Sequence, residues 1–119
     1  MKPIEVVDLQ LQAYINRNIV DFAATYADDV RVFDIGTSVP IHQGKSAIIA
    51  HYGEKTFARE GLHAEIASRM CIGNKVIDHE ITTWAGIAKP IDSVVVYEVV
   101  DDLIQNVWFF DALAPTLFQ

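Results

Sequence analysis

The hydrophobic pattern of the chain changes near residue 61, and this change limits the folds that are possible. Before it, apolar residues recur every three or four positions, which predicts three amphipathic helices. These helices span residues 3–16, 19–27 and 45–58. After it, apolar and polar residues alternate, which predicts four strands. These strands span residues 62–72, 76–86, 93–100 and 103–110.

One further strand, over residues 30–34, precedes the third helix. The order helix, helix, strand, helix and four strands is typical of the α+β class. Turn signals join the last four strands, at Gly73-Asn74-Lys75, Lys89-Pro90 and Asp101-Asp102. The segment 62–72 is too long to stay flat, so we expect a bulge near Ala67-Ser68. We predict a curved mixed or antiparallel sheet packed against three helices, with a pocket between them.

Length and charge restrict the number of domains and the partners. A chain of 119 residues suits a single domain, which we expect to span 1–119. Its formal net charge of −7 would repel nucleic acid and anionic membranes, so neither is an expected partner. The first residues show no signal peptide, and no apolar run is long enough to span a membrane. We therefore expect a cytoplasmic protein.

Asp34 is the main candidate for chemistry. Side chains alternate along a strand, so Asp34 shares a face with Val30 and Val32. A carboxyl group that closes an apolar face loses water, which raises its pKa towards the range of a general base. The alternative is that Asp34 lies past the end of the strand and caps the turn that contains Gly36.

Three segments of the chain resemble a known family. They are 26–34, which opens with Tyr26-Ala27-Asp28-Asp29, then 44–52, and finally 104–111. Together with the order of elements, they resemble the NTF2-like superfamily, specifically its ketosteroid isomerase-like and SnoaL-like branch. The resemblance implies a cone-shaped α+β fold with an internal pocket, and it extends over nearly the whole chain.

The resemblance also implies a role for Asp34. In ketosteroid isomerase an Asp base works with a Tyr and a protonated Asp that form an oxyanion hole. Counted from Asp28-Asp29, Asp34 matches the base. The tyrosine position falls near Leu11, with Tyr14 one turn later, and the protonated Asp falls near Val95, which cannot donate. The isomerase oxyanion hole is therefore not reproduced.

The inward positions of the family predict the residues of the pocket in this chain. The inward strand residues are Asp34, Asp78, Glu80, Thr82, Trp84, Val95, Tyr97, Asn106, Trp108 and Phe110. The helices add Tyr14, His51 and Tyr52. From this set we predict Asp34, His51 and Tyr14 as catalytic residues. The predicted ligand contacts are Tyr52, Glu80, Trp84, Tyr97, Asn106, Trp108 and Phe110.

Several of these residues have a second interpretation. His51 could form a proton-transfer pair with Asp34, or lie on the solvent side of its helix, or serve as a hydrogen-bonded packing residue. Asp78 and Glu80 could raise each other's pKa, or lie where the strand reaches solvent. The aromatic residues could belong to the core, or form the walls of a cavity for a flat apolar ligand.

Three polar residues, His63, Glu65 and His79, are expected on the outer face of the sheet. There they would form a cross-strand cluster or part of a dimer contact. Their spacing fits no compact metal motif, so we predict no metal. We predict no cofactor either. The expected partners are a hydrophobic small molecule and a second copy of the chain.

Three functions follow as hypotheses. The first is proton transfer on a hydrophobic carbonyl ligand with Asp34 as base, in an isomerase, cyclase or lyase that uses general acid–base catalysis. The second is binding of a hydrophobic small molecule without catalysis. The third is association with another protein through an exposed sheet face.

Overall fold

A six-stranded mixed sheet forms the larger layer of the molecule. The computed structural model describes residues 1–111. The strands are β1 (Tyr26–Asp34), β2 (His42–Gln43), β3 (His63–Ile72), β4 (Lys75–Thr83), β5 (Ile91–Val100) and β6 (Leu103–Asp111). Their order in the sheet is β2-β1-β6-β5-β4-β3. Strands β1 and β6 pair in parallel, and the other neighbours pair antiparallel.

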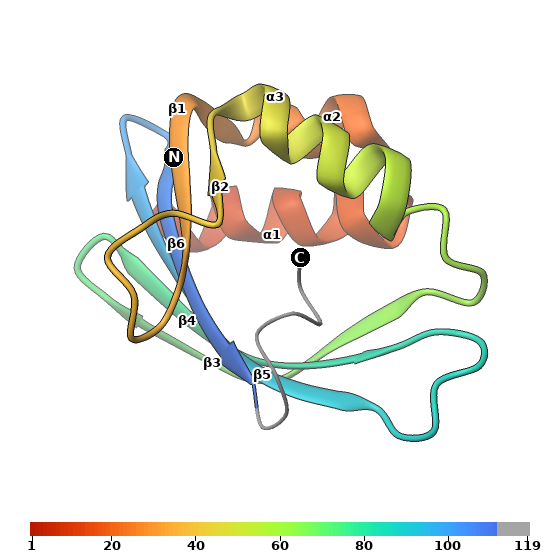
Figure 1. Ribbon diagram of the computed structural model, residues 1–119. Coiled ribbons are helices and arrows are strands. Elements are labelled where there is room, and N and C mark those ends of the chain that lie inside the picture. The colour runs from red at the N-terminus through yellow and green to blue at the C-terminus, as the bar shows by residue number, and fades with distance from the viewer. Residues whose placement is uncertain (112–119) are drawn as a thin grey trace.

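Helices cover one face of this sheet (Figure 1). They are α1 (Pro3–Ile15), α2 (Ile19–Ala24), α3 (Lys45–Ile48) and the π-helix η1 (Ile49–Thr56), which continues α3. The sheet curves around them, so its concave face is the one that meets the helices (Figure 1). The predicted α+β class and the curved mixed sheet with helices on one side are therefore confirmed.

The strand boundaries follow the predicted turns. The pairing of β3 with β4 shifts register between Ile66 and Ser68, at the place expected for a bulge. Asp101 and Asp102 have φ angles of 51° and 65° and join β5 to β6. Positive φ at both central residues is typical of the type I′ hairpin turn, which Asp tolerates better than most residues.

The structure differs from the prediction at one helix end and by one additional strand. The second helix does not reach residue 27, because β1 already starts at Tyr26, which pairs with Ile104 of β6. Between the predicted strand 30–34 and the predicted helix 45–58 lies a further short strand, β2, which pairs with Arg31 and Val32 of β1. In both places the backbone hydrogen bonds go to a strand that is distant in sequence, and such pairing overrides local propensity.

The predicted third helix is mostly a π-helix rather than an α-helix. In η1, His51, Tyr52 and Thr56 all face the inside of the molecule. A Cβ atom at Gly53 would lie 3.1 Å from Cγ1 of Ile19, so a glycine lets η1 approach α2 closely. π-Helical turns are rare and often occur at functional sites.

The core lies between the concave face and the helices. Its fully buried members include Val6 and Val7 of α1, Phe22 of α2 and Ile104 of β6. None of the helices in residues 1–111 combines the length and the apolar character needed to cross a membrane.

Candidate functional site

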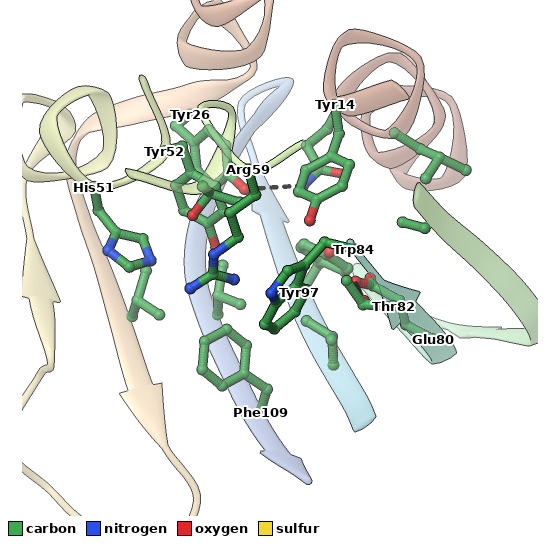
Figure 2. A pocket seen from close by; sticks show the side chains of 17 residues that line it. Tyr14, Tyr26, His51, Tyr52, Arg59, Glu80, Thr82, Trp84, Tyr97 and Phe109 are labelled. Carbon is green, nitrogen blue, oxygen red and sulfur yellow. Dashed lines mark hydrogen bonds between the residues drawn. The ribbon is translucent and has the colours of Figure 1, made fainter. Parts of the chain in front are cut away.

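A cavity lies between the concave face of the sheet and helices α1 and η1. Ten of its lining residues are labelled in Figure 2, namely Tyr14, Tyr26, His51, Tyr52, Arg59, Glu80, Thr82, Trp84, Tyr97 and Phe109. The cavity has a free volume of about 40 Å³. Cavities that hold drug-sized ligands measure about 300–1,000 Å³, so a larger ligand requires some of these side chains to move.

Glu80 brings a carboxyl group into this cavity. It lies on β4 two residues from Asp78 and two from Thr82, so all three side chains share the concave face. The Thr82 hydroxyl donates a hydrogen bond of 3.0 Å to Oε1 of Glu80. Burial, together with the neighbouring charge of Asp78, raises the pKa of Glu80 to about 7, although the hydrogen bond from Thr82 and the charge of Arg69 act in the opposite direction. The carboxyl group can therefore both take up and release a proton near neutral pH.

Asp78 shares this strand face but has a cation as its partner. Arg69, directly opposite on β3, donates two hydrogen bonds to Asp78, of 2.6 Å from Nε and 2.9 Å from Nη2. This geometry is the bidentate pairing that makes arginine–carboxylate contacts strong. In the described part of the chain, Glu80 has no such ion pair, and its side-chain hydrogen bond comes from Thr82. The two carboxyl groups therefore have different chemistry.

Four tyrosines line the same cavity as Glu80. Burial raises the pKa of Tyr14, Tyr26, Tyr52 and Tyr97, and the negative charge of Glu80 raises all four further. The phenols therefore stay neutral and keep their O–H donors. Gln10 donates a hydrogen bond of 3.1 Å to the hydroxyl of Tyr26. Neutral donors in a desolvated site are suited to stabilise an oxyanion.

His51 enters the cavity from η1. It is buried, and its ring centroid lies 4.4 Å from that of His42 and 4.9 Å from that of Tyr52. The solvent-facing position considered for His51 is therefore wrong. Its pairing with Asp34 stays a prediction.

Arg59 and Trp84 lie together at the end of the cavity. The guanidinium carbon of Arg59, just after η1, lies 4.1 Å from the centre of the Trp84 ring, just after β4. Both side chains are half-buried. The contact is a cation–π interaction, which is worth about 0.5–1 kcal/mol at exposed sites and about 2 kcal/mol when desolvated. These two side chains can therefore separate at small energetic cost.

Six of the predicted site residues line the cavity, namely Tyr14, His51, Tyr52, Glu80, Trp84 and Tyr97. The sequence interpretation did not include Gln10, Tyr26, Arg59 and Phe109, which line it as well. Tyr26 falls at the end of the predicted helix 19–27, and Arg59 falls just past the end of the predicted helix 45–58. Phe109 lies on the face of the strand 103–110 that the family resemblance predicts to be the outer one, and both faces of this strand are apolar.

Three predicted ligand contacts lie on the wrong face of the sheet. Val107 and Phe109 line the cavity, so Asn106, Trp108 and Phe110 point to the opposite face. Pairing with β1 sets this phase, because Val32 lies opposite Val107 on the inner side and Phe33 lies opposite Trp108 on the outer side. A shift of one residue in a strand exchanges its two faces.

Asp34 lies at the end of β1, outside the cavity wall. Its register partner is Phe109, so it shares the concave side with Val32, but it is half-buried and does not line the cavity. The turn after it is held by the backbone carbonyl of Asp34, which accepts hydrogen bonds from the amide and the hydroxyl of Thr37 at 3.1 and 3.0 Å. Its catalytic role stays a prediction.

Within residues 1–111, no three histidine, cysteine or acidic side chains gather as metal ligands would. His63 and Glu65 are exposed on β3. Nε2 of His79 lies 2.7 Å from Oδ1 of Asp92, on the outer face of the sheet.

Comparisons with known proteins agree with this architecture. Residues 7–107 match the family model of the SnoaL-like domain. An uncharacterized cystatin-fold protein from Novosphingobium aromaticivorans superposes with a TM-score of 0.82 at 24% identity, over 92% of this chain and 98% of that one. A computationally designed 17-OHP binder gives 0.79 at 19% identity, over 95% and 96%.

A third structure has a ketosteroid isomerase-like fold. It is a hypothetical protein from Catenulispora acidiphila in complex with trimethylamine, with a TM-score of 0.73 at 17% identity, over 100% of this chain and 93% of that one. At these identities the likeness concerns the fold. The search of curated proteins found no match.

Proposed function

This chain belongs to the SnoaL-like domain family, and from this premise we propose that its cavity binds a hydrophobic carbonyl compound on which Glu80 moves a proton. The proposal is based on the Glu80 carboxyl group, which shares the cavity lining with four tyrosines. Burial raises the pKa of this group to about 7. A base is most effective when its pKa is close to the pH at which it works.

The proposed reaction removes a proton from the carbon next to the carbonyl group. The Glu80 carboxylate takes this proton, and the electron pair of the broken C–H bond moves to the carbonyl oxygen to give an enolate. The neutral phenol of Tyr14 or Tyr52 donates a hydrogen bond to that oxygen. If the proton returns to another carbon, the product is an isomer and the enzyme is an isomerase. If the enolate attacks a second carbonyl group within the ligand, the product is a ring and the enzyme is a cyclase.

The test is exchange of α-protons of cyclic and aryl ketones with D2O, followed by NMR. We expect Glu80→Gln to lower the exchange rate about 10²–10⁴-fold, the usual contribution of a general base. Asp34→Asn is the matched control, because it also neutralises one carboxyl group on the concave side. If Asp34→Asn abolishes exchange and Glu80→Gln does not, the base is Asp34, as the resemblance implied.

Binding without catalysis is the second candidate function. The designed relative is named as a 17-OHP binder, and so a fold of this type supports small-molecule binding. A thermal-shift series with neutral ketones separates the two candidates. Ligands that raise the melting temperature but exchange no α-proton favour binding alone.

An apolar stripe on the outer sheet face supports a homodimer as the assembly. Directly paired residues run across five strands in the order Phe33, Trp108, Val96, Ile77 and Met70. Met70 is 59% exposed. A stripe of this kind is self-complementary about a two-fold axis, which is how most homodimers form. Recruitment of a different protein to the same stripe is the alternative, and a monomer in sedimentation would favour it.

A further inference from the structure

We propose that the ligand of this cavity carries a carboxylate that pairs with Arg59, while its flat apolar part lies against Trp84. The inference deepens the proposed function, since it uses the same cavity and narrows the ligand to aromatic carbonyl compounds that also carry a carboxylate. It does not depend on proton transfer by Glu80.

The first observation is the position of Arg59. Its side chain is half-buried, lines the cavity and lies between His51 and Trp84 in Figure 2. The phenols of Tyr14 and Tyr52 line the same cavity, and the positive charge of Arg59 lowers the pKa of both. A ligand that reaches these phenols therefore passes close to Arg59.

The second observation is the lack of a counter-ion within the part of the chain that the structure describes. There, Arg69 pairs with Asp78, Lys45 with Asp28 and Lys75 with Glu98, whereas no carboxylate lies within ion-pair distance of Arg59. Half-buried cations are normally paired, because partial desolvation without a partner is unfavourable. An anionic ligand would supply the partner.

The third observation is the stacking of Arg59 on Trp84. The guanidinium group of Arg59 lies over the indole ring, with its central carbon 4.1 Å from the ring centre. Its N–H donors lie in the plane and stay available at the edge, in the fork that binds a carboxylate through two hydrogen bonds. The indole offers an aromatic surface beside that fork. Carboxylate and aryl ring are therefore recognised by adjacent groups.

Because the molecule as a whole is negatively charged, binding of an anionic ligand depends on a local positive charge such as that of Arg59. The net charge of −7 repels anions in general. Inside the cavity, Glu80 is the one lining carboxyl group in residues 1–111, and its raised pKa lets it carry a proton near neutral pH. With Glu80 protonated, Arg59 gives the cavity a positive charge. The free volume of about 40 Å³ is small, so a single-ring ligand needs the least rearrangement of the lining side chains.

The test compares benzoate with benzamide, which have nearly the same shape and differ in charge. Ligand-observed NMR or calorimetry gives the affinity of each for the wild-type protein. We expect benzoate to bind about tenfold more tightly, as a charge-assisted pair in a partly desolvated site does. We expect Arg59→Gln to remove this preference, with the affinity for benzamide unchanged, and Arg59→Lys to retain part of it.

Arg31→Gln is the matched control. It removes the same charge from an exposed arginine that lies over Phe33, on the outer face of the sheet. We expect its preference for benzoate to equal that of the wild type. Unchanged binding of benzamide shows that each variant is folded.

Three results would overturn the proposal. They are equal affinities of the wild type for both probes, an equal loss in Arg59→Gln and Arg31→Gln, and no binding of benzoate at millimolar concentration. The α-proton exchange of neutral ketones is measured independently, so failure of Glu80 as a base and failure of Arg59 as an anion site are distinguishable.

Discussion

The pH dependence of stability provides a sharp test of the Glu80 environment. The pKa of this carboxyl group is about 7 in the folded protein, against an ordinary value of 4.5. Between these values the folded state holds a proton that the unfolded state has released. The free energy of unfolding therefore decreases as pH rises through this window.

The size of the effect follows from the two pKa values. Each tenfold difference in proton affinity is worth about 1.4 kcal/mol, so the values 4.5 and about 7 correspond to about 3 kcal/mol. This stability is fully present below pH 4.5 and is lost by about pH 7. Glu80→Gln cannot ionise, so it keeps the amide form at all pH values and lacks this loss.

The assay is urea unfolding of the wild type and Glu80→Gln at a series of pH values. All other titrating groups are common to both proteins, so their difference isolates Glu80. We expect the variant to gain about 3 kcal/mol relative to the wild type between pH 4.5 and pH 7. Glu54→Gln, the same substitution at an exposed position of η1, sets the baseline. A difference that stays constant across this window would refute the burial of Glu80.

Three further predictions concern packing and assembly. Arg69→Ala leaves the buried carboxylate of Asp78 without its bidentate partner, so we expect a loss of about 3–5 kcal/mol in chemical unfolding, and a loss below 1 kcal/mol would contradict the pairing. Trp84→Ala removes the aromatic surface against which the ring of the ligand would lie, so benzoate should bind more weakly than to the wild type, as measured by calorimetry; unchanged binding would show that Trp84 is not a ligand contact. Met70→Glu places a charge on the outer apolar stripe, so sedimentation should show monomers where the wild type shows dimers, and an unchanged dimer would place the interface elsewhere.

The hydrophobic pattern predicted much of the candidate site because it depends on local periodicity. Helical spacing groups Tyr14 and Tyr52 with the apolar residues of their helices, and strand alternation groups Glu80 with Trp84. The family resemblance predicts that these faces, and that of Tyr97, are turned inward. To predict these positions it is enough to know which residues share a face of a helix or strand and that this face is turned inward.

The local pattern could not predict the register between neighbouring strands. In β6, Val107 and Phe109 alternate with Trp108 and Phe110, so both faces are apolar and either phase is consistent with the sequence. The parallel register with β1 decides between them. The choice of Glu80 over Asp34 as the carboxyl group that lines the cavity depends likewise on where each strand ends relative to the cavity.

The amino-acid sequence by itself therefore determined the class of fold, the order of its elements and most of its turns, because amphipathic period and turn chemistry act over a few residues. Tertiary structure alone decided the strand β2, the π-helical geometry of η1, the outward face of Trp108 and the meeting of Arg59 with Trp84. Each of these depends on contacts between segments that are distant in the chain. Their free energy arises from pairing and burial in three dimensions, and local sequence does not encode it.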